Sequence, residues 1–200
     1  GGQPVDLSPR NVLRRVLKLY ADEGWKPVVA PEMEFYLVQI EPDEDIPLKP
    51  PVGRTKRTEA GMQSFSMDAI NEYDDIFDVM YDWCEAEGIQ LDTLIHEMGT
   101  AQMEINIDHG DPLPLADQVF LFKRTIREVA IRHQMYATFM AKPMQGQPGS
   151  AMHIHQSVVG IDDGRNIFST ADGQASDRFF HFIGGLQTYL PAATAFFAPY

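Results

Sequence analysis

The sequence predicts an α+β protein with one mostly antiparallel sheet and helices packed on one side of it. Three observations support this fold class. Residues 27–40 form a long apolar segment rich in β-branched and aromatic side chains, which favours a strand. Residues 90–96 and 102–108 have the same character, and the short connection through Gly99 favours two neighbouring strands. Between the strands lie segments whose apolar residues recur with the period of a helix.

The predicted helices follow from their end signals and their apolar periodicity. Ser8 can cap the first helix, Pro9 sits where its missing N–H is harmless, and Gly24 ends it. Its apolar stripe consists of Val12, Leu13, Val16, Leu17 and Tyr20. The other helices are predicted over residues 68–87, residues 116–135 and residues 176–197, with a break in the last one at Pro191.

The remaining segments are predicted as short strands and loops. Strands are expected at residues 136–140, across the segment that contains His153 and His155, and near residues 166–168. Residues 41–58 and 142–149 are rich in proline or glycine and show no periodicity, so we expect loops there.

Composition excludes several classes of protein. The 200 residues carry a formal net charge of −13, which argues against a general surface for nucleic acids or anionic membranes. The sequence shows no signal peptide and no apolar run long enough to span a membrane. The single cysteine, Cys84, cannot form an internal disulfide and is expected as a core residue of a cytoplasmic protein. Because the chain opens on Gly1-Gly2 and stops inside an apolar run, we expect it to be a segment of a longer protein.

Two apolar segments each carry a pair of ligand-type side chains one residue apart, Glu32 with Glu34 and His153 with His155. Side chains on a strand alternate between faces, so each pair is predicted to project from one side of the sheet. Two neighbouring buried carboxylates are costly without a counter-charge, and a divalent cation removes that cost. The pairs therefore predict a metal site on one face of the sheet.

Glu97 and Glu104 lie in similar apolar, strand-like surroundings and extend this hypothesis. Any one of these acids alone would often simply face solvent, and a lone strand histidine is more often a hydrogen-bonded core or surface residue than a ligand. All four acids together with His153 favour the metal site. Oxygen-rich ligation with a single histidine suits Mg²⁺ or Mn²⁺ better than structural zinc.

The loop over residues 145–150 precedes the histidine strand and contains two glycines. It is not a phosphate-binding Walker A loop, because no Gly-Lys-Ser/Thr follows, and by itself it predicts an ordinary turn. The patterns of a dinucleotide-binding fold and of an esterase nucleophile elbow are also absent.

Taken together, these segments resemble the catalytic domain of the glutamine synthetase family. The motifs that carry the resemblance are P-E-M-E-F at 31–35, H-E-M-G-T-A-Q-M-E-I-N at 96–106 and P-G-S-A-M-H-I-H-Q-S at 148–157. The shorter F-M-A-K-P at 139–143 and the final F-F-A-P-Y also match. The resemblance spans the whole chain and implies a single, incomplete catalytic domain over residues 1–200. It further implies a curved sheet that carries the metal site, with helices on its outer face.

The resemblance also implies roles for individual residues. Glu34, Glu97 and Glu104 would bind one cation, while Glu32 and His153 would bind a second one together with a Glu beyond Tyr200. His155 and Ser157 match positions that contact ATP in the family. Gly149 matches a position near the glutamate substrate. Asp92 lies where the family can place an acid near the nucleotide. No catalytic residue in the narrow sense is expected within the chain.

The implied reaction is ATP-dependent ligation of the γ-carboxylate of glutamate to an amine through γ-glutamyl phosphate.

Pro148 and Ala151 stand where glutamine synthetases commonly have Asn and Gly. The motifs H-E-M-G-T-A-Q-M-E-I-N at 96–106 and F-M-A-K-P at 139–143 resemble the branch that uses putrescine or a related polyamine. Ammonia as the nucleophile is the nearest alternative. A non-catalytic descendant and a metallohydrolase are the alternatives outside the ligase class, although all five metal-type residues are present.

Members of this family assemble as homo-oligomeric rings with active sites between subunits. The expected neighbouring-subunit domain, the arginines that bind phosphate and glutamate, and the last metal ligand are not among these 200 residues. The resemblance therefore predicts that the segment by itself has no ligase activity.

Overall fold

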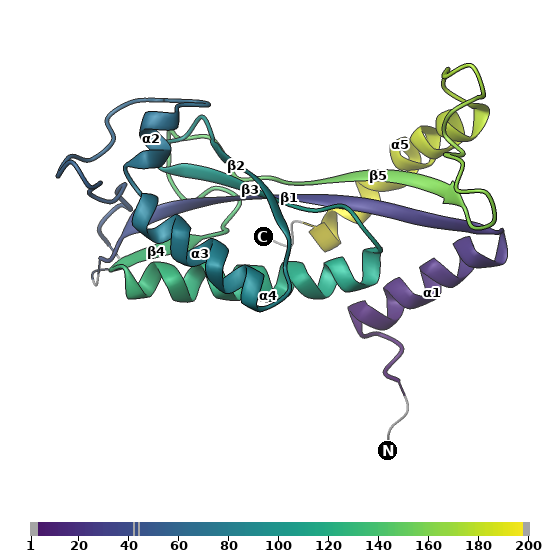
Figure 1. The fold of residues 1–200 in the computed structure, drawn as a ribbon, viewed down its shortest axis with the longest axis horizontal. Coiled ribbons are helices and arrows are strands. Elements are labelled where there is room, and N and C mark those ends of the chain that lie inside the picture. The colour runs from purple at the N-terminus through teal and green to yellow at the C-terminus, as the bar shows by residue number, and fades with distance from the viewer. Residues whose placement is uncertain (1–3, 42, 44, 198–200) are drawn as a thin grey trace. The chain divides into compact units, whose positions relative to one another are not determined.

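A computed structural model describes residues 4–41, 43 and 45–197. The helices are α1 (Pro9–Asp22), α2 (Met67–Asn71), α3 (Asp74–Ala86), α4 (Pro112–Arg132) and α5 (Asp177–Phe197) (Figure 1). The strands are β1 (Trp25–Gln39), β2 (Leu91–His96), β3 (Gln102–Ile107), β4 (Met135–Thr138) and β5 (Met152–Gly160). The chain divides into two compact units, one formed by residues 29–155 and one by residues 1–28 and 156–200. Among the described helices, none combines the length and apolar character needed to cross a membrane.

The unit of residues 29–155 contains the sheet that was predicted from the strand patterns. The strand order is β2-β3-β1-β4, and β5 also pairs with β1. The pairs β1–β3, β1–β4 and β2–β3 are antiparallel, so the predicted α+β class with a mostly antiparallel sheet is confirmed. The long strand β1 lies at the centre of these pairings.

Alternation along β1 divides the sheet into two faces with different surroundings. Met33, Phe35 and Leu37 are buried in one core with residues of β3, α3 and α4. On the opposite face, Tyr36 and Val38 pack against Met144 and the half-buried Leu48 from the loops. Within this unit, α3 and α4 therefore cover one face of the sheet, and the acids of β1 lie on the other face.

The second unit combines α1, the start of β1, the end of β5 and α5. Ile161 N donates to Gly24 O, which ties the residues after β5 to the end of α1. The Arg178 guanidinium lies 4.4 Å from the centroid of the Trp25 ring, and Phe168 packs against aromatic side chains of α5. The expected strand near residues 166–168 is only an isolated bridge between Val159 and Asn166.

Several predicted boundaries were wrong. The helix expected over residues 68–87 is two helices, α2 and α3, because the backbone leaves the helical region at Tyr73, whose buried side chain donates to Pro51 O at 3.4 Å. The helix expected to start at residue 116 begins at Pro112, since prolines in a first turn lose no helical hydrogen bond. It ends at Arg132 rather than Met135, because Gln134 has a φ of 58°.

The terminal helices also differ from expectation. The helix α5 runs through Pro191 without a break, because one missing N–H removes a single hydrogen bond while the neighbouring turns keep theirs. Ser8 is the N-cap of α1, but its side chain makes no capping hydrogen bond. The apolar stripe of α1 includes no buried residue, and Val12 and Val16 are among the exposed apolar side chains.

Cys84 lies in the core as predicted, which leads to a chemical expectation. Its side chain is fully buried, and burial, with a smaller contribution from Glu87, raises the pKa of the thiol from 9.0 to about 12. Because the thiolate is the reactive form, we expect negligible alkylation of the folded protein at pH 7.5 and rapid alkylation in denaturant. Mass spectrometry after iodoacetamide treatment measures both rates. Equal rates in the two conditions would contradict this packing.

Candidate metal and substrate site

The four predicted acids lie on two neighbouring strands and on the turn between β2 and β3. In the antiparallel register, Glu34 of β1 is directly opposite Glu104 of β3, and Glu32 is opposite Asn106. The side chains of Glu34 and Glu104 are almost completely buried, with residues 8% and 6% exposed. Two carboxylates therefore face each other across the strand pair in a largely desolvated place, and this pairing depends on the register of the two strands.

Glu34 is held by neutral donors. Its Oε2 accepts from Gln102 Nε2 and from the backbone N–H of Ala151, both at 3.0 Å. Gln102 Nε2 also donates to Gly149 O at 3.0 Å. The amide of Gln102 thus joins β1, β3 and the glycine loop at one point, and sequence reasoning did not assign it a role. Its position two residues before Glu104 on β3 was the available signal.

The two histidines of β5 approach the acids of β1. His155 Nε2 lies 2.6 Å from Glu32 Oε1. His153 Nδ1 lies 3.3 Å from Glu32 Oε2 and 3.9 Å from Glu34 Oε1. Both imidazoles are more than half exposed, whereas Glu32 is only 23% exposed. The histidine strand therefore contributes its side chains from the solvent side of the acid cluster.

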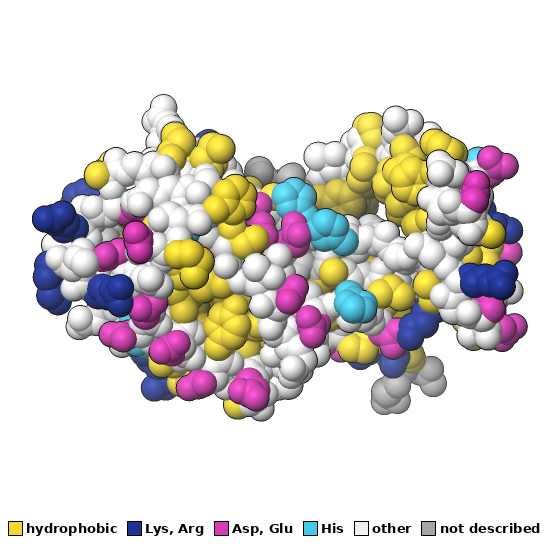
Figure 2. Space-filling view, turned by 45° about the horizontal axis from the view of Figure 1, so that its top comes forward, with side chains coloured by type: hydrophobic (Ala, Val, Ile, Leu, Met, Phe, Trp, Pro, Cys, Tyr) yellow, Lys and Arg dark blue, Asp and Glu magenta, His cyan; other side chains and the backbone are white. Residues whose placement is uncertain are grey.

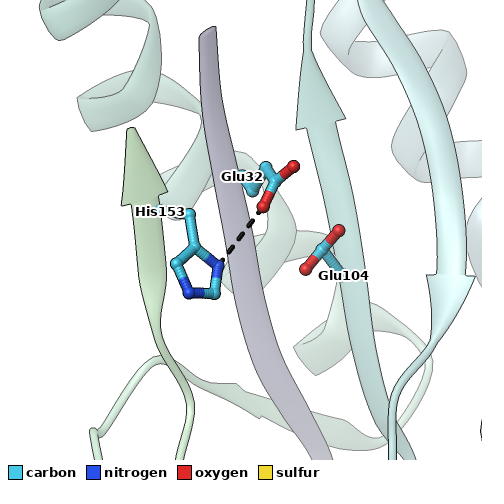
Figure 3. Close-up of side chains that lie close together, drawn as sticks. All are labelled: Glu32, Glu104 and His153. Carbon is cyan, nitrogen blue, oxygen red and sulfur yellow. Dashed lines mark ion pairs between the residues drawn. The ribbon is translucent and has the colours of Figure 1, made fainter. Parts of the chain in front are cut away.

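One group of three side chains has the geometry of a metal site. Single ligand atoms of Glu32, Glu104 and His153 all lie within 4.8 Å of one another (Figure 3). Acidic and imidazole side chains also gather on one face in the space-filling view (Figure 2). The expected division instead placed Glu104 with Glu34 and Glu97. Within the described part of the chain, neither of these two acids belongs to a comparably close group of three.

The negative charges gathered in this group favour the binding of a cation. Burial raises the pKa of Glu104, and the charges of Glu32, Glu97 and Glu34 raise it further, while a hydrogen bond from Asn106 opposes the shift. Asn106 Oδ1 is itself buried with no hydrogen-bond partner among the described residues. Several carboxylates, an imidazole and a spare amide oxygen are ligands that Mg²⁺ and Mn²⁺ accept. The donor set therefore fits a divalent cation.

Glu97 stands where β2 turns toward β3. Its Oε2 accepts from its neighbour Met98 N at 3.3 Å, and its own N–H donates to Gln102 O at 2.8 Å. The turn needs glycine at position 99, because a Cβ there would collide with the hydroxyl of Tyr36. That hydroxyl donates to Pro148 O at 2.8 Å, and burial, with the charges of Glu34 and Glu97, raises its pKa to about 12.

The residues predicted to contact substrates come from the loop before β5, from β5 itself and from β2. A Cβ on Gly149 would lie 2.7 Å from Ala141 O, so only glycine allows this close backbone approach beside Gln102. Ser157 lies on β5 in the unit of residues 1–28 and 156–200, and Asp92 is exposed on β2. Of the residues expected to contact ATP, His155 lies beside Glu32.

Comparison with known proteins identifies the family of this chain and agrees with its fold. Residues 6–200 match the model of the glutamine synthetase catalytic domain, so the chain belongs to the glutamine synthetase family. It is 36% identical over 200 residues to the gamma-glutamylputrescine synthetase PuuA of Escherichia coli K12, covering 99% of this chain and 42% of that protein. It is 35% identical over 198 residues to glutamine synthetase of Pyrococcus abyssi, covering 99% of this chain and 42% of that protein.

A solved structure gives the same result for the fold. The ligand-free structure of GmaS superimposes with a TM-score of 0.83 at 30% sequence identity, covering 97% of this chain and 44% of that one. The chain thus spans less than half the length of the relatives it matches. The names of these two relatives give different products, γ-glutamylputrescine and glutamine, but the two proteins are almost equally similar to this chain.

Proposed function

We propose that the protein to which these residues belong joins the γ-carboxylate of glutamate to an amine in a reaction that requires ATP and Mg²⁺ or Mn²⁺. The observation that carries the proposal is the cluster of buried carboxylates and an imidazole on the sheet of a glutamine synthetase catalytic domain. In this reaction the carboxylate of glutamate takes the terminal phosphoryl group of ATP, and an amine then displaces phosphate from γ-glutamyl phosphate. A bound divalent cation would neutralise phosphoryl charge and orient the carboxylate.

The proposed roles of the residues rest on the resemblance of their motifs to those of the family. Glu34, Glu97 and Glu104 hold one cation, and Glu32 and His153 contribute to a second. Gln102 and the Ala151 N–H orient Glu34 so that its Oε1 remains available to a ligand. The backbone at Gly149, beside Gln102, contacts the glutamate substrate, and His155 and Ser157 contact ATP. We extend the proposal to a cytoplasmic protein that forms a ring-shaped homo-oligomer.

We propose a polyamine such as putrescine as the nucleophile, supported by the motifs at 96–106 and 139–143 and by the likeness to gamma-glutamylputrescine synthetase. Ammonia is the second candidate, because the identity to a glutamine synthetase is nearly as high. Phosphate release by the purified protein with glutamate, ATP and Mg²⁺ decides between them. We expect at least about tenfold higher kcat/KM with putrescine than with ammonia, which corresponds to about 1.4 kcal/mol. Turnover with ammonia and none with putrescine would reverse the order.

The same assay tests the wider proposal. Phosphate release must require glutamate, an amine and a divalent cation together, and turnover of a substrate by water without ATP would indicate a metallohydrolase. A protein that neither turns over nor binds Mn²⁺ would be a non-catalytic descendant of the family. The 200-residue chain expressed by itself is expected to show no ligation, and measurable turnover by that chain would contradict this expectation.

A further inference from the structure

A buried carboxylate outside the acid cluster contacts the turn that carries Glu97. Glu59 lies in the long segment between β1 and α2, and its side chain is only 5% exposed. Its Oε2 accepts from Ala101 N at 2.9 Å and lies 3.1 Å from Nε2 of His96. The fully buried His96 directly precedes Glu97, and its Nδ1 lies 2.7 Å from the backbone oxygen of Glu97.

These contacts bind a turn in which one residue, Ala101, has an unfavourable backbone conformation. Ala101 has a φ of 55°, in the left-handed region that residues other than glycine rarely adopt. It is completely buried, and its oxygen accepts from Leu37 N at 3.0 Å, so its neighbours leave it little freedom. Such a conformation persists only when the surrounding contacts hold it. The hydrogen bond from Ala101 N to Glu59 is one of these contacts.

A second contact links the same segment to His96. Phe65 N donates to His96 O at 2.9 Å, so the backbone of His96 and its imidazole are both bound from the segment that precedes α2. Both ring nitrogens of His96 lie within hydrogen-bonding distance of an oxygen, the carboxylate of Glu59 and the backbone oxygen of Glu97.

Stability alone does not explain this arrangement. A buried carboxylate often contributes no more to stability than an apolar side chain of similar volume would. Here one carboxylate oxygen, Glu59 Oε1, is also buried with no hydrogen-bond partner among the described residues, which adds to the cost. A buried carboxylate with one unpartnered oxygen needs an explanation other than stability. The contacts of Glu59 with the turn provide such an explanation.

We infer that Glu59 is a positioning residue that fixes the carboxylate of Glu97 for metal binding by holding His96 and Ala101. This inference rests on the proposed metal site. Glu59 reaches no substrate or metal in this role. It acts through the turn between β2 and β3, whose two ends carry Glu97 and Gln102, the side chain that orients Glu34.

The test compares Mn²⁺ affinity in four purified proteins by calorimetric titration: wild type, Glu59→Ala, Glu59→Gln and Glu87→Ala. Glu87 is the control, because it also accepts a hydrogen bond, from Oγ1 of the buried Thr125 at 2.7 Å, but is itself exposed and contacts none of the predicted ligands. We expect Glu59→Ala to weaken Mn²⁺ binding about tenfold, as loss of an outer partner of a metal ligand does. Glu59→Gln keeps an oxygen for Ala101 N and should recover most of the affinity, while Glu87→Ala should bind like wild type.

The outcomes separate the inference from the proposed function. If wild type binds no Mn²⁺, the proposed metal site fails and the inference with it. If wild type binds and Glu59→Ala binds equally well, the inference alone is overturned. An equal loss in Glu59→Ala and Glu87→Ala would show a general effect of instability and would also overturn it. The same conclusion follows if both Glu59 variants fail to fold while Glu87→Ala folds, because Glu59 would then support the whole fold.

Discussion

Glu104→Gln is expected to weaken Mn²⁺ or Mg²⁺ binding more than about 100-fold, beyond the loss caused by removing an outer-shell partner. The substitution keeps the size of the side chain but removes a carboxylate that lies close to Glu32 and His153 and opposite Glu34. Without metal, the same variant is expected to be more stable than wild type at neutral pH. The reason is that it removes a buried negative charge that its acidic neighbours repel.

The pH dependence of this metal-free stability has a definite sign. The folded-state pKa of Glu104 is raised above its ordinary value of 4.5. Its contribution to wild-type stability is therefore present below that value and lost as pH rises through the raised pKa. Thermal unfolding in EDTA should show an advantage of the variant that is largest near pH 7 and shrinks toward pH 4.

A surface variant provides the control for Glu104→Gln. Glu128 is exposed on α4 and lies 3.8 Å from Arg132, so Glu128→Gln should change stability by less than about 1 kcal/mol and leave metal binding unchanged. If Glu104→Gln kept wild-type metal affinity, Glu104 would not be a ligand. A metal-free variant that is less stable than wild type at pH 7 would show that the carboxylate has a stabilising partner.

Phe35→Ala is expected to lower the free energy of unfolding by about 3–5 kcal/mol, as deletion of a fully buried aromatic side chain does. Phe35 is fully buried on the helix-facing side of β1, with its ring centroid 5.3 Å from that of Phe139. The surrounding strands and helices cannot fill the resulting cavity without moving. Urea denaturation followed by circular dichroism measures the change.

Phe120 supplies the comparison within the same residue type. It is 72% exposed on α4, so Phe120→Ala should change the free energy of unfolding by no more than about 0.5 kcal/mol. A loss below about 1.5 kcal/mol for Phe35→Ala would mean that β1 does not present this residue to the core. The assignment of Glu32 and Glu34 to the opposite face would then fail as well.

The faces of β1 were predictable from sequence because strand alternation is local. The order P-E-M-E-F alone separates Glu32 and Glu34 from Met33 and Phe35. The structure confirms the separation, because Met33 and Phe35 lie in the core with α3 and α4, whereas His153 approaches Glu32 and Glu34. The strand pair around Gly99 was predictable because two strand-like segments are joined by a short connection. The expected roles of the acids came from the family motifs, since alternation does not indicate them.

The remaining features depend on contacts between distant segments. Glu59 meets His96 and Ala101 across 37 and 42 residues, and no spacing in the sequence indicates those contacts. The hydrogen bond from Gln102 to Glu34 spans 68 residues. The break between α2 and α3 depends on the burial of Tyr73 against Pro51, which helical periodicity does not register.

We propose that the paired acids of β1 serve two different cations. A crystal structure with Mn²⁺ tests this directly, because anomalous scattering locates each ion. We expect two peaks, one bound by Glu34, Glu97 and Glu104 and one bound by Glu32 and His153. A single ion held by Glu32, Glu104 and His153, the group already close together in the structure, would contradict it.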